Sequence, residues 1–424
     1  MGQEPQKDLD VGQQIGEDMT EGTVLDLFCG AGGASLGFVK AGFKIIGAVD
    51  ADATALDIYR KNLCETDLDE YPGEVAFDEP LAADLSRDHQ DEDVDDDLPT
   101  VTFADIRDEF GLEQGEVDVI CGCPPCQNFS SLRDTKPWPE DKPKDSLLQA
   151  FVEFIEEEVP DVVFFENVRN IMSAGSEENP TTYVDWLIRN MREITRGGDS
   201  SEEGGYGVEL DVVNAADYGV PQRRRRTIGL FVYGAAADEI SLPDPTHAED
   251  PDADEELEPW RTVGEWLDRD WLRSDLESGE RQDGSVEGYE ADPAHRSRNH
   301  HTRTIERMEA IRRHGSKWRD LQGTDDEEYI VEAHRNLDGG AGSEYGIVDA
   351  NSPAPTLTTR CTTPSCGRFT HPEQNRALTF REAALLMTFP REFELPDKND
   401  AAERVVGNAV PPEMVRSLAE GVDI

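Results

Sequence analysis

An apolar run that leads straight into a glycine-rich turn is the feature that most constrains how this chain can fold. The run TVLDLF starts at Thr23 and is followed by CGAGGASLGF and then by a predicted helix. The segments KIIGAVD (44–50), VDVICG (117–122) and DVVFFENV (161–168) are also short and apolar, and helix-like stretches separate them. Strands that alternate with helices predict an α/β fold built on a largely parallel, doubly wound sheet.

The glycine-rich turn has the properties of a nucleotide-binding loop. Gly30, Gly32 and Gly33 let the backbone pass close to a ligand, and the helix that follows offers free N–H groups. Asp50 ends the next strand, where acidic residues of dinucleotide-binding folds bind a ribose hydroxyl. The spacing departs from G-x-G-x-x-G and no P-loop lysine follows, which favours a nucleoside over a pyrophosphate; a tight turn that binds nothing is the alternative. Asp105, after a third predicted strand, either accepts from an adenine amino group or caps a helix.

The stretch CGCPPCQNFSS, which starts at Cys121, places three cysteines within six residues. Cys123 and Cys126 have the CxxC spacing of a zinc site or a redox dithiol, but zinc needs four ligands and Cys361 with Cys366 is only a looser second pair. In a disulfide oxidoreductase, the CxxC pair would lie at the start of a helix and the whole chain would be much shorter. The third interpretation is a nucleophile, because Cys126 follows a strand end where α/β sheets place their ligand crevice. Cys121 and Cys123 are then expected to be small buried thiols.

An arginine run in QRRRRT (222–227) is the positive group that could favour a thiolate. Runs of charge often form solvated faces, but this one lies between two apolar segments. In an extended segment Arg224 and Arg226 point to one side with Gln222, and Arg223 and Arg225 point to the other.

An acidic residue, Glu166, ends the apolar strand FFENV. A carboxylate after such a run is expected to be partly desolvated, which favours its protonated form and suits it to donate a proton. A surface acid at a strand end is the alternative.

These elements together resemble the DNA (cytosine-5) methyltransferase family. The resemblance runs in order along nearly the whole chain and rests on DLFCGAGGASLGF, Asp50, Asp105, CPPCQNFS, FFENV, YGVPQRRRR, RALTFREAALLMTFP and GNAVPP. It implies a SAM-dependent methyltransferase (Rossmann-like) doubly wound sheet with a smaller target-recognition domain. It also implies S-adenosylmethionine as cofactor, double-stranded DNA as partner and no metal.

The resemblance assigns a role to individual residues. The implied cofactor-binding residues are Phe28, Gly30, Gly32, Gly33, Asp50, Asp105, Pro125 and Asn408. The implied catalytic residues are Cys126, Glu166, Arg224 and Arg226. The Cys126 thiolate adds to C6 of cytosine while Glu166 protonates N3, after which C5 takes the methyl group. Arg224 holds the base or a nearby phosphate, and Arg226 supports the catalytic loop. The base must leave the duplex for this chemistry.

Composition divides the chain into four parts. We expect a polar tail at 1–21, a catalytic domain at 22–236, a target-recognition domain at 237–371, and a segment at 372–424 that completes the catalytic domain. Residues 65–100 are acid-rich and are predicted to form an insertion or a surface loop.

Two further segments are expected to meet DNA. The polar stretch 127–143 is long enough to close over a flipped base. His300, Thr302, Arg303 and Arg307 either contact the major groove, where base pairs are distinguishable, or form a solvated helix face.

The charge of the chain is unusual for a DNA-binding protein. The 424 residues carry 92 acidic and 40 basic side chains, nine of them lysine, and a formal charge of −52. Such a balance argues against a phosphate-binding partner in dilute salt. Proteins of salt-saturated cytoplasm have acidic, lysine-poor surfaces whose repulsion is screened, since the Debye length falls to about 3 Å near molar salt. We therefore predict a halophilic protein.

Neither a basic, apolar leader nor a run of about 18 apolar residues is visible, so we expect a cytoplasmic protein that does not enter membranes. A monomer with a cognate restriction endonuclease as partner would fit. A tRNA cytosine-5 methyltransferase of the same fold is the main alternative, although such enzymes usually lack a large recognition domain. A non-catalytic DNA reader would be expected to lose Cys126, Glu166 or Arg224, and all three are present.

Overall fold

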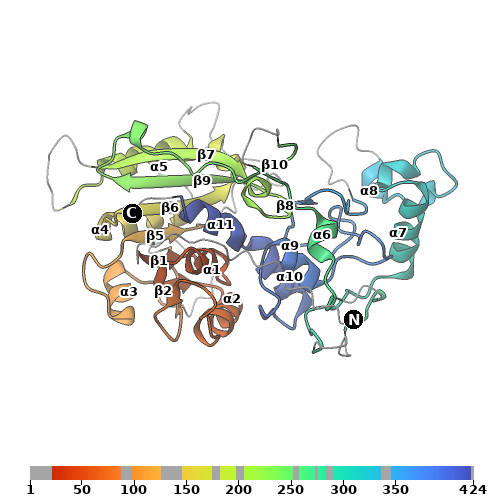
Figure 1. Ribbon diagram of the computed structural model, residues 1–424, viewed down its shortest axis with the longest axis horizontal. Coiled ribbons are helices and arrows are strands. Elements are labelled where there is room, and N and C mark those ends of the chain that lie inside the picture. Colours follow the sequence, from red (N-terminus) through yellow and green to blue (C-terminus); the bar gives the residue numbers. More distant parts are fainter. Residues whose placement is uncertain are drawn as a thin grey trace, which may run out of the picture.

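The computed structural model shows a sheet-containing half and a half made of short helices and loops (Figure 1). It describes residues 22–86, 98–125, 146–173, 182–196, 205–251, 257–272, 276–282, 290–335 and 345–421. The labelled strands of the large sheet lie in the left half of Figure 1, and α6 to α10 lie in the right half.

The sheet has eight strands among the described residues, in the order β3-β2-β1-β5-β6-β9-β7, with β4 also paired to β2. The strands are β1 (Thr23–Leu27), β2 (Lys44–Asp50), β3 (Glu74–Val75), β4 (Leu81–Ala82), β5 (Val119–Gly122), β6 (Val162–Val168), β7 (Tyr206–Asn214) and β9 (Arg225–Tyr233). All neighbours are parallel except β9, which runs antiparallel to both β6 and β7. The predicted largely parallel sheet is confirmed.

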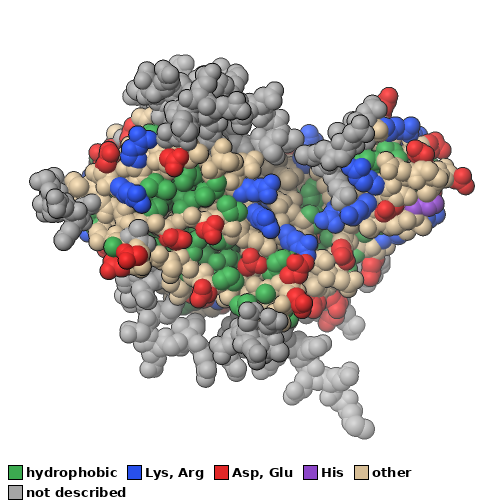
Figure 2. Space-filling view, turned by 90° about the horizontal axis from the view of Figure 1, so that it is seen from above, with side chains coloured by type: hydrophobic (Ala, Val, Ile, Leu, Met, Phe, Trp, Pro, Cys, Tyr) green, Lys and Arg blue, Asp and Glu red, His purple; other side chains and the backbone are tan. Residues whose placement is uncertain are grey.

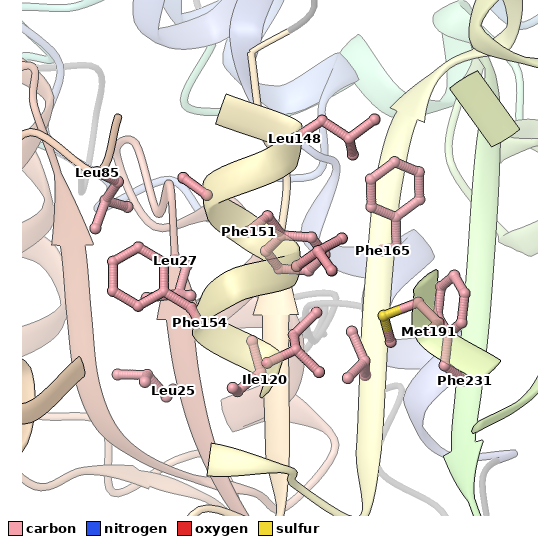
Figure 3. Close-up of a cluster of buried hydrophobic side chains, with 14 of the residues drawn as sticks. Leu25, Leu27, Leu85, Ile120, Leu148, Phe151, Phe154, Phe165, Met191 and Phe231 are labelled. Atoms are coloured by element: carbon pink, nitrogen blue, oxygen red, sulfur yellow. The ribbon is translucent and has the colours of Figure 1, made fainter. Parts of the chain in front are cut away.

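Helices cover both faces of this sheet. They are α1 (Gly33–Lys40), α2 (Ala53–Tyr59, continued by the π-helix Arg60–Cys64), α3 (Phe103–Phe110), α4 (Ser146–Glu158), α5 (Tyr183–Glu193) and α11 (Pro412–Ala419). Successive residues of a strand point to opposite faces. Leu25 and Leu27 therefore join a core with α4, in which Figure 3 shows Phe151 and Phe154. Val24 faces the other core, which contains residues of α1 and α11, so the C-terminal helix packs back onto the sheet as expected.

The second half is built from short elements. They are β8 (Gln222–Arg223), β10 (His247–Ala248), β11 (Glu258–Pro259), β12 (Ala354–Pro355), α6 (Val263–Leu267), α7 (Thr302–His314), α8 (Glu332–Arg335), α9 (Phe380–Leu386) and α10 (Asn399–Asn408). A small core of Ile311, Trp318, Leu321 and Tyr345 lies beside α7. A larger apolar cluster brings Leu36 and Tyr59 of the sheet half together with residues of α9 and of 354–357, so the halves share a continuous core.

One local prediction is incomplete and one is wrong. Residues 65–100 contain β3 and β4, which extend the edge of the sheet beside β2, so the segment is not only a surface loop. No strand directly precedes Asp105; the described residues there form only a single bridge, from Asp84 to Thr100, before α3 begins. Within the part of the chain that the structure describes, no helix is long and apolar enough to cross a bilayer.

Candidate active site

The candidate site lies where the carboxyl ends of four parallel strands meet. Leu27 pairs with Val49 and with Gly122, and Gly122 pairs with Phe165, so β1, β2, β5 and β6 end at the same edge of the sheet. The residues that follow these ends are the predicted site residues. Ligands of open α/β sheets bind at this edge.

The glycine loop after β1 has an unusual backbone that Asp50 holds in place. Phe28, Gly30 and Gly32 all have positive φ angles, of 62°, 53° and 88°. Asp50 at the end of β2 accepts a hydrogen bond from the backbone N–H of Gly30 (2.9 Å) and another from that of Asp52 (2.8 Å). Burial raises the pKa of Asp50 above its ordinary value. The Asp50 carboxylate thus links the loop after β1 to the end of β2.

Two glycines of the loop are required by packing, and one borders open space. A Cβ on Gly33 would lie 2.3 Å from the carbonyl oxygen of Val410, and a Cβ on Gly32 would lie 2.2 Å from Cδ1 of Leu63. At Gly30, no atom of the described residues lies within 4 Å of the corresponding position. The backbone at Gly30 is therefore accessible to a ligand.

A buried carboxyl below the loop is a residue that the sequence analysis missed. Asp26 of β1 accepts a hydrogen bond from the Ser35 hydroxyl (2.5 Å), which accepts in turn from the Tyr59 hydroxyl (2.9 Å). Asp26 is fully buried, and burial raises its pKa to about 7. A single acid within the apolar run TVLDLF was the signal that could have identified it.

The structure places Asp105 in a helix cap. The N–H and the hydroxyl of Thr102 both donate to Oδ2 of Asp105 (2.8 and 2.7 Å), which makes a capping box at the start of α3. The hydrogen bond from the Thr102 side chain lowers the pKa of Asp105, which is exposed. The helix-cap interpretation is confirmed, and a contact with adenine stays a prediction.

The cysteine-rich stretch after β5 is described only in part. Cys121 is fully buried, and its hydrogen bond with Cys123, together with burial, raises its pKa well above the ordinary value. The side chain of Asn167 at the end of β6 donates to the carbonyl of Pro124 (3.1 Å), which fixes the turn against the neighbouring strand. Cys126 lies outside the described residues. The described residues contain no cluster of three or more metal-binding side chains.

Pro125 and Asn408 border the candidate site but make no contact that tests their predicted roles. Pro125 is exposed at the end of the described part of this turn. Asn408 is the last residue of α10 and is also exposed. Their predicted contacts with a cofactor stay predictions.

Glu166 and Arg226 form an ion pair at this edge. Oε1 of Glu166 lies 2.9 Å from Nε of Arg226, and the two side chains are 10% and 13% exposed. Antiparallel pairing of β6 with β9 sets Arg226 opposite Val168, two residues beyond Glu166. The guanidinium therefore orients the carboxylate in a largely desolvated position.

Arg224 binds backbone groups of the protein, and the predicted alternation is confirmed. Gln222 and Arg224 are buried, whereas Arg223 and Arg225 are exposed. The Arg224 guanidinium donates to the carbonyl oxygens of Leu357 (2.9 Å), Gly407 (3.1 Å) and Ala409 (2.9 Å). The buried guanidinium is thus bonded to three backbone carbonyls, and the predicted contact with a base or a phosphate stays a prediction.

Two of the four residues proposed for DNA contacts, both on α7, also bind within the protein. Arg303 donates to the carbonyl of Glu328 (3.0 Å) and Arg307 donates to that of Tyr329 (2.8 Å). Burial lowers the pKa of His300 to about 4. Thr302 and Arg303 are exposed and Arg307 is partly buried, so the solvated-face interpretation fits the first two, and contacts with DNA stay a prediction.

Comparison with known proteins identifies the family. The family model for the C-5 cytosine-specific DNA methylase matches residues 22–75 and 96–423. The chain is 30% identical over 406 residues to the Type II methylase M.HgiDII of Herpetosiphon aurantiacus, with 95% of each chain covered. It is 30% identical over 400 residues to the Type II methyltransferase M1.HphI of Haemophilus parahaemolyticus, covering 94% of this chain and 86% of the relative.

A solved structure agrees with the fold. A protein described as a DNA modification methyltransferase, encoded in an Escherichia coli prophage, has a TM-score of 0.55 at 22% identity, covering 94% of this chain and 98% of that one. The sheet is thus that of SAM-dependent C5 methyltransferases. By its match to the family model over most of its length, the protein belongs to the C-5 cytosine-specific DNA methylases.

Proposed function

We propose that this protein transfers a methyl group from S-adenosylmethionine to C5 of a cytosine that is flipped out of double-stranded DNA. The observation that carries the proposal is the Glu166–Arg226 ion pair, at the same sheet edge as the glycine loop and the CPPC turn. A carboxyl group beside a cofactor loop and a cysteine-bearing turn is the combination that cytosine C5 chemistry requires.

The residues at the loop fit S-adenosylmethionine. The accessible backbone at Gly30 suits a close approach by the ligand, and Asp50, whose oxygens each retain a second lone pair, suits the ribose hydroxyls. Phe28 offers an aromatic surface beside them. Asp105, Pro125 and Asn408 are proposed to complete the adenosine site. When bound, the cofactor supplies a methyl group activated by a sulfonium centre.

The protein's own residues prepare the base. The thiolate of Cys126 forms a bond to C6, which breaks the aromaticity of the ring and makes C5 nucleophilic. Glu166 donates a proton to N3, which neutralises the charge that the addition places on the ring. Arg226 holds Glu166 toward the base. After methylation, the C5 proton leaves to solvent, the bond between C6 and the Cys126 sulfur breaks, and N3 returns its proton to Glu166, which restores the aromatic ring.

Residues 237–371 are proposed to recognise the DNA sequence, with 372–424 completing the catalytic domain. Figure 2 shows Lys and Arg side chains in a band from the middle of the upper face toward its right side, although acidic side chains dominate the composition. Such a band suits contacts with phosphates. A monomer that acts in the cytoplasm alongside a restriction endonuclease is the biological setting that we propose.

Transfer of labelled methyl groups tests this proposal. In molar KCl, the purified chain is incubated with S-adenosylmethionine labelled in the methyl group and, in separate reactions, with unmethylated duplex DNA and with unmodified tRNA. We expect label in DNA, recovered as 5-methylcytosine after enzymatic digestion. Label in tRNA alone would overturn the proposal in favour of a tRNA methyltransferase, and label in neither would overturn both.

A further inference from the structure

Two side chains of one short segment hold three parts of the chain that are distant in sequence. Arg224 is 2% exposed, and its guanidinium donates to the carbonyls of Leu357, Gly407 and Ala409. Leu357 lies two residues after the end of β12, and Gly407 and Ala409 lie at the end of α10. One cation therefore bridges two segments that lie more than a hundred residues away from it in sequence.

Gln222 also binds the segment after β12. Its side-chain oxygen accepts from the backbone N–H of Leu357 (2.9 Å), and its amide nitrogen donates to the carbonyl of Leu386 at the end of α9 (3.2 Å). The N–H of Leu357 is thus held by Gln222 while its C=O is held by Arg224. Pairing of β8 with β12 adds further backbone contact at the same place.

The other end of the bridge leads to the glycine loop. Ala409 precedes Val410. A Cβ on Gly33 would lie 2.3 Å from the carbonyl oxygen of Val410, so the two residues are in close contact. The segment that Arg224 holds is therefore in direct contact with the first turn of α1, at the loop proposed to bind the cofactor. A Cβ on Gly407 would lie 2.3 Å from the backbone nitrogen of Thr359, so the two bridged segments also touch each other.

We propose that Arg224 is a positioning residue that joins the DNA-recognition segment at 354–359 to the cofactor-side segment at 407–410. Gln222 assists by joining Leu357 of the recognition segment to Leu386 at the end of α9. This inference rests on the proposed function, since it assumes that the glycine loop binds S-adenosylmethionine and that 237–371 bind DNA. Arg224 then supports binding of both ligands without touching either, whereas Arg226 acts through Glu166 in the chemical step.

Binding constants of three variants test this inference. Arg224→Met removes the bridge but keeps an apolar side chain of similar length, Arg224→Lys keeps the charge, and Gln222→Leu releases only Leu357 and α9. The full chain is titrated with S-adenosylmethionine and with a duplex that carries the motif methylated by the wild-type protein. We expect Arg224→Met to raise both dissociation constants at least about tenfold, since tenfold corresponds to about 1.4 kcal/mol, the scale of one hydrogen bond to a charged group. Arg224→Lys should recover part of both losses, and Gln222→Leu should weaken DNA binding more than cofactor binding.

Arg223→Met is the matched control, because Arg223 directly precedes Arg224 in the chain but points outward to Glu249 (2.6 Å) and to the ring of Trp260. It should leave both dissociation constants within about threefold of the wild type.

For Arg224→Met that is folded, as judged by thermal unfolding, kcat at saturating ligands should stay within about threefold of the wild type. A loss of kcat with unchanged binding, or weaker binding of only one ligand, would overturn the bridging role; if Arg224→Met does not fold, the same criteria apply to Arg224→Lys. Wild-type protein that binds neither ligand would instead refute the proposed function.

Discussion

Nε of Arg226 lies 2.9 Å from Oε1 of Glu166 across the antiparallel pair of β6 and β9. Both side chains are largely buried at the edge of the sheet where the glycine loop begins. The guanidinium fixes the direction of the carboxylate and compensates its burial. This pair is the part of the site from which the chemical step can be tested most directly.

Glu166→Gln should slow the chemical step without weakening cofactor binding. The amide keeps the shape of the carboxyl group but cannot donate the proton that the base requires. We expect kcat to fall by about 10²- to 10⁴-fold, the usual contribution of a positioned general acid. Glu249→Gln is the matched control, since Glu249 forms an exposed ion pair with Arg223 on the outward side of the same arginine run. Equal kcat values for Glu166→Gln and the wild type would contradict the role of Glu166.

Asp50→Asn should weaken cofactor binding and leave kcat at saturation nearly unchanged. The carboxylate accepts from the N–H groups of Gly30 and Asp52 with its two oxygens, and an amide can accept with only one. One N–H, that of Gly30 or that of Asp52, then loses its protein partner, at a cost of up to about 1–3 kcal/mol. Calorimetric titration should show a dissociation constant for S-adenosylmethionine at least about tenfold higher.

The neighbouring Asp52 supplies the control for that experiment. It caps α2 by accepting from the N–H groups of Thr54 (2.9 Å) and Ala55 (3.2 Å). Asparagine is as good an N-cap as aspartate, so Asp52→Asn should bind the cofactor as the wild type does. Similar losses in both variants would indicate a general effect of charge near the loop and would refute the specific role of Asp50.

Asp26 should make the stability of the fold depend on pH in a predictable direction. Burial raises the pKa of Asp26 to about 7, whereas an aspartate of the unfolded chain titrates near 4. The folded state therefore keeps a proton that the unfolded state loses, and the stability contributed by this proton is present below about pH 4 and disappears as the pH rises to about 7. Asp26→Asn imitates the neutral carboxyl at every pH. The free energy of unfolding in urea, wild type minus variant, should fall by roughly 2 kcal/mol from pH 5.5 to 8. A difference that stays constant over this range would show that Asp26 does not titrate there.

Salt should activate the enzyme if its acidic surface is an adaptation to a salt-rich cytoplasm. The formal charge of −52 opposes both folding and approach to DNA until ions screen it. Methyl transfer measured against KCl concentration should therefore rise into the molar range. A maximum below about 0.2 M, where the Debye length is still near 8 Å, would contradict the halophilic interpretation.

The sequence predicted those parts of the molecule whose causes are local. β1, β2, β5 and β6 are short apolar segments, and the alternation of Arg223 and Arg224 follows from the two-residue period of a strand. By contrast, the partners of Arg224 could not be predicted, because they are backbone carbonyls of Leu357 and Gly407, which have no signature in the sequence. The short strands β3 and β4 were missed for a related reason, since each adds only two residues to an edge of β2.

Asp26 was predictable in part. The position of an acid in an apolar strand was visible, but its partner Ser35 lies on the following helix, and only the fold brings the two together. Asp105 shows the opposite case, because its helix-capping role follows from Thr102 three residues earlier. Local patterns thus identified elements and caps, whereas contacts between segments required the structure.

Bisulfite sequencing tests the central claim most directly. DNA is taken from cells with a salt-rich cytoplasm that express the chain, and from the same kind of cells that express Cys126→Ser. This variant keeps a small polar side chain but replaces the thiolate with a much weaker nucleophile. The account predicts 5-methylcytosine at one sequence motif with the wild-type chain, and none with Cys126→Ser. Methylation at the same motif by Cys126→Ser, or no methylcytosine with the wild-type chain, would contradict it.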